Sequence, residues 1–268
     1  MSQQNSAVLM HQRDNGISEI VLNRPDKRNA FDDVIIQQLI NAFEYVHRDP
    51  ETQIVILRSE GKHFSAGADL GWMRRMAENT RQENLDDSRE LARLMNTINH
   101  LSKPVIGLVQ GAAFGGAVGL AACCDIVLAT QSASFCLSEV KLGLIPAAIS
   151  PYVVRAIGER QARRYFLSAE VFSAREAQQF GLVHMVCDDE QALQARCNEL
   201  LQQMVNNGPE AMKAAKDLVF AVSHKPITAD LIDDTAQRIA DIRVGAEGQE
   251  GLSAFLNKRK ASWIPETQ

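Results

Sequence analysis

The chain has 268 residues, which fits one large domain or two ordinary ones at roughly 100–200 residues per domain. Hydrophobic residues make up 46% and charged residues 23% of the sequence, a composition that excludes disordered and fibrous proteins. The formal net charge of −5 provides no basic field for a polyanion, so we expect no nucleic-acid partner.

The first 24 residues predict a hairpin in which strands at 7–12 and 17–24 flank a turn at 14–16. Apolar residues at helical intervals then predict a helix over 32–49, and a buried strand follows at 53–59. A second helical stretch runs over 69–101 and is broken near Asn79 and Thr80. A strand at 104–109, a helix at 115–123 and strands at 125–130 and 133–138 come next.

This alternation of strands and helices predicts an α/β fold with parallel strands. Over the last 110 residues or so, helical periodicity dominates, with one short strand at 182–187. We therefore expect a mostly helical C-terminal region on a single fold.

Residues 105–124 form an apolar run long enough to span a bilayer. The preceding Lys103-Pro104 and the pair Gly115-Gly116 instead indicate a strand followed by a short helix, so we expect no membrane association.

The five cysteines show no C-x-x-C pair and no zinc spacing, which predicts reduced thiols in the core. Residues 1–16 resemble neither a secretory signal nor a transit peptide, so a cytoplasmic location is expected.

Two loops rich in small residues each follow a buried strand. The first is SAGADL at 65–70, in which Asp69 can cap a helix. The second is GAAFGGAVG at 111–119, which matches neither a dinucleotide-binding nor a P-loop pattern. A helix that starts near Gly116 exposes unpaired N–H groups. One N–H from each loop would bind a carbonyl oxygen that gains negative charge.

These blocks, with FCLSEVKLGLIP at 135–146, resemble the crotonase superfamily of enoyl-CoA hydratases and isomerases over nearly the whole chain. The resemblance implies a crotonase-like ββα-superhelix core over 1–200 and a helical oligomerisation region over 201–268. It also implies that the N–H groups of Ala68 and Gly116 form an oxyanion hole and that Glu139 is the catalytic acid and base. Hydratases usually carry a second glutamate where this chain has Gly119, and its loss leaves Glu139 to transfer both protons or to share them.

The resemblance also implies how the substrate is held. Most residues expected to bind CoA lie in or near the first loop and the preceding block: Arg28, Ala30, Ser65, Ala66, Asp69 and Leu70. The family further uses an aromatic residue and a lysine, here Phe255 and Lys258, often toward a neighbouring subunit's CoA. The acyl pocket is expected to include Trp72, Arg74, Arg75, Ile145 and Pro146. His63 has no counterpart in the family's chemistry and is interpreted as incidental.

The blocks FGGAVGLAACCDI and SEVKLGLIPAAISPYVVRAIG look most like bacterial hydratases of methylglutaconyl-CoA and isohexenylglutaconyl-CoA. The expected activity is hydration of a branched 2-enoyl-CoA such as 3-methylglutaconyl-CoA, in leucine or terpene breakdown. Because such a substrate carries a second carboxylate, Arg74 or Arg75 is expected to face it. The alternatives are a Δ3,Δ2-enoyl-CoA isomerase and a non-catalytic acyl-CoA-binding protein. No metal or cofactor beyond the CoA substrate is expected, and the family implies a homotrimer or a dimer of trimers.

Overall fold

The computed structural model describes residues 6–264. Residues 1–5 of the expected core and 265–268 of the expected C-terminal region lie outside the described residues. The strands are β1 Val8–Arg13, β2 Ile17–Leu22, β3 Ile54–Ser59, β4 Val105–Val109, β5 Ala112–Phe114, β6 Ile126–Thr130, β7 Ser134–Cys136, β8 Val171–Ser173 and β9 Met185–Cys187. The α-helices are α1 Asp33–Arg48, α2 Leu70–Glu78, α3 Arg81–Asn99, α4 Gly116–Ala122, α5 Ser150–Ser168, α6 Ala174–Phe180, α7 Glu190–Met204, α8 Pro209–Val222, α9 Ala229–Val244 and α10 Ala246–Leu256. Two short 3-10 helices are η2 Pro25–Lys27 and η3 Glu139–Leu142.

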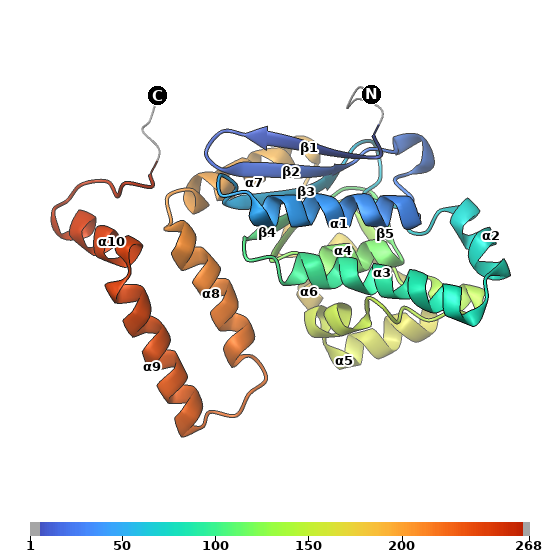
Figure 1. Cartoon of the computed structure of the whole chain (residues 1–268). Helices are drawn as coiled ribbons and strands as arrows, with labels where there is room; N and C mark the ends of the chain where they lie inside the picture. Colours follow the sequence, from blue (N-terminus) through green and yellow to red (C-terminus); the bar gives the residue numbers. More distant parts are fainter. Residues whose placement is uncertain (1–5, 265–268) are drawn as a thin grey trace.

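The predicted α/β architecture is confirmed (Figure 1). Within residues 6–264 the main sheet has the order β1-β2-β3-β4-β6-β9, in which β1 pairs antiparallel with β2 and every other pair is parallel. Successive side chains along the buried strands point to opposite faces of the sheet, and both faces pack against helices. Val55 and Leu57 face the core under α1, α3 and α4, whereas Ile54 and Ile56 pack with α7.

Local signals place the helices where the sequence predicts them. Asp32 accepts a hydrogen bond from the Ile35 N–H and so starts α1. Thr80 and Glu83 form a capping box that separates α2 from α3, which confirms the predicted break. The apolar run at 105–124 forms β4, β5 and α4, and no helix in the described part of the chain is long and apolar enough to cross a membrane. All five cysteines are buried and free of disulfides, as expected.

A second, three-stranded sheet of order β5-β7-β8 was only partly predicted. The strand expected at 133–138 is present as β7, but β5 and β8 were missed because three-residue strands carry too few side chains to show alternation. β7 pairs parallel with β5 and antiparallel with β8, an antiparallel pair that the alternation of strands and helices did not predict. This sheet fixes the position of the start of α4, because β5 leads directly into that helix.

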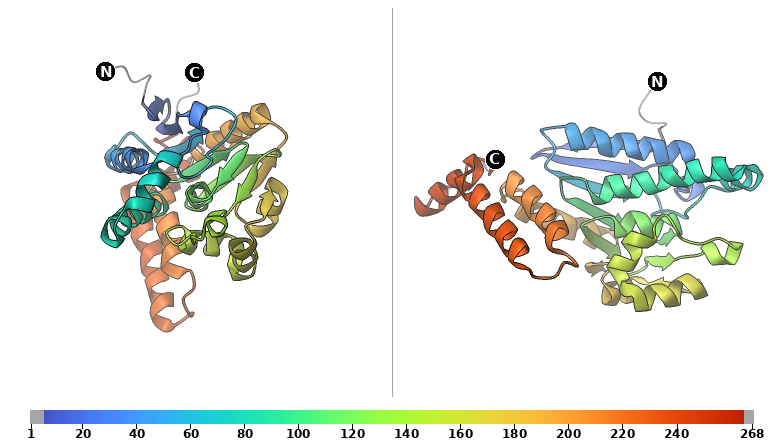
Figure 2. Two further views of the ribbon diagram at one scale, coloured as in Figure 1. Left: turned by 90° about the vertical axis from the view of Figure 1, so that its right-hand side faces the viewer. Right: turned by 60° about the horizontal axis from the view of Figure 1, so that its bottom comes forward.

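The C-terminal helices α8, α9 and α10 form an arm that extends away from the sheet (Figures 1 and 2). The boundary expected between residues 200 and 201 falls inside α7, and the arm begins at Pro209. A salt bridge between Lys216 Nζ of α8 and Asp125 Oδ2, at 2.7 Å, joins the arm to the core. The arm and α2 lie at opposite ends of the molecule in Figure 1.

Candidate functional site

The two small-residue loops lie side by side. The Ser65 N–H donates to Ala112 O at 3.0 Å, and the Phe114 N–H donates to Ser65 O at 3.0 Å. A Cβ at Gly67 would lie 2.8 Å from Phe114 O, so only glycine allows the backbones this close approach. The hydrogen bonds between the loops therefore fix the positions of Ala68 and Gly116, which lie at the ends of the two loops.

Phe31 sets the spacing between the two loops. Its N–H donates to Gly67 O and its carbonyl accepts from the Asp69 N–H, both at 2.9 Å, so its backbone brackets Ala68. Its ring lies against Gly116, where a Cβ would come within 2.7 Å of the Phe31 Cζ. Phe31 was not predicted as a site residue, because in the sequence a phenylalanine before a helix has the same pattern as any core residue.

Within residues 6–264, neither the Ala68 N–H nor the Gly116 N–H donates a hydrogen bond. Gly116 is the first residue of α4, where the N–H groups have no partner within the helix. Backbone N–H groups left unpaired beside each other are suited to binding an oxygen that becomes an anion. Both N–H groups are thus free to donate to a ligand, and their role as an oxyanion hole stays a prediction.

Glu139 lies close to the start of α4. The Gly115 N–H donates to Cys136 O at 2.8 Å, which brings the end of β7 against the second loop. A Cβ at Gly115 would lie 3.4 Å from Glu139 Oε1, and Glu139 Oε2 is buried with no hydrogen-bond partner in the described chain. Burial raises the pKa of the Glu139 carboxyl above its ordinary value. A carboxyl in this state is prepared to take and return a proton.

Ile149 fills the space beside Gly119. A Cβ at Gly119 would lie 2.2 Å from Ile149 Cγ2 and 3.1 Å from Met95 Sδ. Gly119 and Ile149 are both buried, so a glutamate cannot enter this position without displacing the isoleucine. The missing acid is therefore replaced by apolar packing.

Several residues expected to bind CoA gather at the first loop. Ala30 and Ser65 are buried, and Asp69 caps α2 by accepting from the Gly71 and Trp72 N–H groups, as predicted. Leu70 is 72% exposed.

Arg28 and Ala66 share a cavity of about 520 Å³. Arg28 is exposed, and its carbonyl accepts from the Ala66 N–H at 2.9 Å. Lys62, which was not predicted as a site residue, adds a second cation to the lining, and Glu190 adds an acid.

The residues expected in the acyl pocket are more scattered. Trp72 is buried and its Nε1–H donates to Asp87 Oδ2. Arg75 forms an ion pair with Asp33, whereas Arg74 is exposed and has no ion-pair partner within the described residues. After η3, Ile145 is 73% exposed and Pro146 is buried.

Phe255 and Lys258 do not join this site. Phe255 lies in the last turn of α10 and is 81% exposed, and Lys258 is exposed just beyond the helix. Both belong to the arm, at the opposite end of the molecule from α2 (Figure 1).

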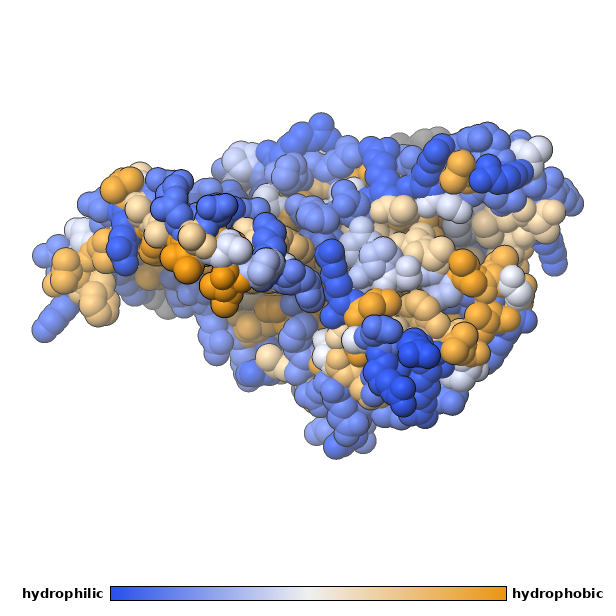
Figure 3. Space-filling view, turned by 90° about the horizontal axis from the view of Figure 1, so that it is seen from below, coloured by the Kyte–Doolittle hydropathy of each residue, from blue (hydrophilic) through white to orange (hydrophobic). Residues whose placement is uncertain are grey.

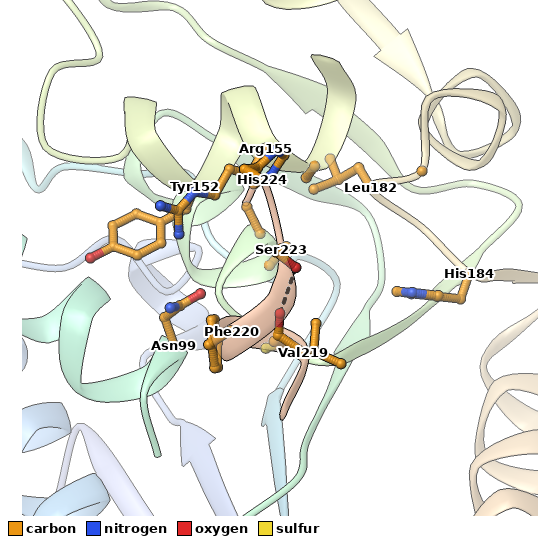
Figure 4. Close-up of a pocket in the computed structure, with 14 residues that line it drawn as sticks. Asn99, Tyr152, Arg155, Leu182, His184, Val219, Phe220, Ser223 and His224 are labelled. Carbon is orange, nitrogen blue, oxygen red and sulfur yellow. Dashed lines mark hydrogen bonds between the residues drawn. The ribbon is translucent and has the colours of Figure 1, made fainter. Parts of the chain in front are cut away.

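A separate cavity of about 320 Å³ lies between the core and α8 (Figure 4). It is lined by Ala121 and Ala122 from the carboxyl end of α4 and by polar side chains that include Tyr152, Arg155 and His184. None of the predicted site residues lines it.

Residues 12–266 match the family model described as enoyl-CoA hydratase/isomerase. A 2,3-dehydroadipyl-CoA hydratase of Escherichia coli is 33% identical over 90% of this chain and 92% of its own. A trans-2-decenoyl-(acyl-carrier-protein) isomerase of Streptococcus mutans is 29% identical over 94% of this chain and 96% of its own.

The fold agrees with these matches. The crystal structure of an enoyl-CoA hydratase from Shewanella pealeana superposes with a TM-score of 0.93 at 46% identity, covering 97% of both chains. The crotonase-like core expected from the sequence is thereby confirmed, and the chain belongs to the enoyl-CoA hydratase/isomerase family.

Proposed function

We propose that the protein is an enoyl-CoA hydratase that acts on a branched 2-enoyl-CoA, with 3-methylglutaconyl-CoA or a related glutaconyl thioester as substrate. The observation that carries the proposal is the half-buried Glu139, whose Oε2 is buried without a partner in the described chain and which lies beside the start of α4, together with the unpaired N–H groups of Ala68 and Gly116. These two donors would hold the thioester oxygen, and each would contribute about 2.7–4 kcal/mol to a transition state with oxyanion character.

Glu139 would carry both proton transfers. Its carboxylate takes a proton from water as the water oxygen bonds to Cβ, and the electron pair of the double bond moves to the thioester oxygen to give an enolate. The enolate then takes the proton back from Glu139 at Cα, which restores the carboxylate. Because one group serves both carbons from one side, we expect syn addition. The raised pKa of Glu139 supports this double role.

A cation without an ion-pair partner in the described chain supports a substrate that carries a second carboxylate. Arg75 is already paired with Asp33, so Arg74, which follows Trp72 by two positions on α2, is the better candidate to pair with the distal carboxylate. The relative named for 2,3-dehydroadipyl-CoA supports a dicarboxylic acyl chain.

A Δ3,Δ2-enoyl-CoA isomerase is the second candidate. Isomerisation moves one proton between two carbons and needs one carboxylate, which fits a site where Ile149 takes the place of a second acid. The Streptococcus mutans relative carries the name of an isomerase.

We further propose that the active unit is a cytoplasmic homotrimer or dimer of trimers that needs no cofactor beyond its CoA substrate. Figure 3 shows hydrophobic residues spread over the arm. α8 and α9 bury no residue, and large apolar side chains remain exposed along the arm, among them Val219, Ile232, Ile239, Val244 and Leu256. Apolar surface of this extent supports contact with another subunit. Phe255 and Lys258 would then reach a neighbour's CoA.

A panel of CoA thioesters with products identified by mass tests these proposals. We expect 3-methylglutaconyl-CoA to gain one water, at a higher kcat/KM than crotonyl-CoA. Migration of the double bond in a 3-enoyl-CoA with no change in mass, and no hydration of either 2-enoyl-CoA, would favour the isomerase. Absence of turnover with every thioester, despite binding, would leave the non-catalytic alternative.

A further inference from the structure

His63 lies at the junction of the two loops that carry the proposed oxyanion donors. Its Nδ1 accepts a hydrogen bond from the Ala112 N–H at 3.1 Å. The same Ala112 accepts through its carbonyl from the Ser65 N–H. Ala112 is therefore held on both sides by the segment that begins at His63, and the chain continues from it through β5 to Gly116.

The backbone conformation of Gly111 allows the His63 imidazole to approach the second loop closely. Gly111 has φ of +57°, and a Cβ there would lie 2.7 Å from His63 Nδ1 and 2.1 Å from Lys62 O. On its other side, the His63 carbonyl accepts from Asn29 Nδ2 at 2.8 Å and from Ser59 Oγ at 3.1 Å. The backbone of His63 is thus fixed, and its ring meets the second loop at a site where only glycine fits.

The hydrogen bond requires a neutral ring. An Nδ1 that accepts from an N–H must be unprotonated, so the ring proton is on Nε2. A doubly protonated imidazole would place two N–H groups against each other at Ala112, and the ring or the loop would have to move.

We propose that His63 is a positioning residue, whose neutral ring holds the loops of Ala68 and Gly116 in the geometry that binds the thioester oxygen and whose protonation slows turnover. This inference rests on the proposed function. It replaces the interpretation of His63 as incidental.

The charges around His63 favour the neutral form. Burial lowers the pKa of His63, and the nearby cations Lys62 and Arg28 lower it further. Glu190, at the start of α7, is the acid among the residues that line the same cavity. Since the pKa in the folded protein lies below the ordinary value of 6.5, the hold is complete at neutral pH and is lost as the pH falls through that lower pKa.

The first test is kcat against pH for the intact enzyme and its variants His63→Ala and His63→Asn. We expect His63→Ala to lose about tenfold in kcat at pH 8, less than the loss of a whole oxyanion donor, with a smaller change in KM. Because the Asn side-chain oxygen can accept from the Ala112 N–H and does not titrate, His63→Asn should regain most of that kcat. The plot of kcat against pH for His63→Asn should also lack one of the ionisations that lower kcat of the wild type at acid pH. The control His11→Asn, on the exposed face of β1, should keep the wild-type profile.

An unchanged kcat in His63→Ala, or a pH profile of His63→Asn that coincides with the wild type, would overturn the inference. A second readout separates it from the proposed chemistry. Amide hydrogen exchange over residues 111–116 should become faster at acid pH in the wild type than in His63→Asn at the same pH. If the protein turns over no thioester but shows this difference, the proposed function fails and the hold by His63 stands. If the exchange does not differ, the hold by His63 fails.

Discussion

Glu139 is a half-buried acid whose Oε2 atom is buried and has no hydrogen-bond partner in the described chain. We expect Glu139→Gln to lower kcat by about 10²–10⁴, because the amide keeps the shape of the carboxyl but can neither take nor return a proton. Turnover of the best thioester measures the loss. Glu159→Gln, an exposed change in α5, is the control and should keep full activity. Wild-type turnover in Glu139→Gln would contradict the single-acid mechanism.

The same acid should make the protein less stable at neutral pH. The folded pKa of Glu139 is raised, so the unfolded chain ionises more readily and stability falls as the pH rises through the folded pKa. We therefore expect Glu139→Gln to melt at a higher temperature than the wild type at pH 8, and the difference to shrink toward pH 4.5. Thermal melts across this range test the sign, and a lower melting temperature of the variant at pH 8 would show that the carboxylate is stabilised in the fold.

Gly119 and Ile149 form one packing unit, which a double-mutant cycle can measure. Gly119→Glu should be strongly destabilising, since overpacking costs about 1–3 kcal/mol and a buried carboxylate adds to that. Ile149→Ala alone should cost about 2–5 kcal/mol through the cavity that it leaves. The double variant should be more stable than the sum of the two effects predicts, by about 0.5–3 kcal/mol. Urea unfolding provides the free energies, and simple additivity would mean that the two sites do not share this space.

At the scale of elements, the sequence predicted most of the framework and missed the short pieces. α1 and the break between α2 and α3 have strong local signals, namely the Asp32 cap and the Thr80 capping box. The three residues of β5 have no such signal, because their strand character comes from long-range pairing with β7. The candidate site was predictable where it lies in a family block, as with Glu139. The contributions of Phe31, Ile149 and His63 were not predictable, because they depend on contacts across the fold.

The ion pair between Lys216 of α8 and Asp125 of the core, called the tether below, joins the arm to the sheet. Lys216 Nζ donates to Asp125 Oδ2 at 2.7 Å and to Lys103 O at 3.2 Å, and Asp125 also accepts from the Val105 N–H at the start of β4. We expect Lys216→Met to cost on the order of 3 kcal/mol, because it leaves the Asp125 carboxylate without its cation.

Hydrogen exchange of α8 and urea unfolding would detect this loss. The matched control is Lys213→Met, one turn earlier on the same helix, whose partner Glu210 is exposed. That surface pair should contribute less than about 1 kcal/mol. Equal effects of the two substitutions would show that the tether adds nothing beyond a surface pair.

At the scale of the whole molecule, the arm that carries Phe255 and Lys258 lies at the opposite end from α2 (Figure 1). If they complete a neighbour's CoA site, Lys258→Ala should raise KM several-fold and leave kcat nearly unchanged, because a contact with CoA that is the same in substrate and transition state affects binding alone. Glu139→Gln should do the opposite.

Mixing the two variants tests whether the arm acts between subunits. In mixed oligomers, a Lys258→Ala subunit keeps Glu139 and can receive an intact arm from a Glu139→Gln neighbour, so part of the activity should return with the wild-type KM. A mixture of Lys258→Ala with additional Lys258→Ala protein is the control and should show no such component. If subunits are exchanged by mild denaturation and the high KM persists in every mixture, the arm does not supply its lysine to a neighbour. If KM instead returns to the wild-type value in the mixed oligomers, the site described in one chain is complete only when a second chain lies against it.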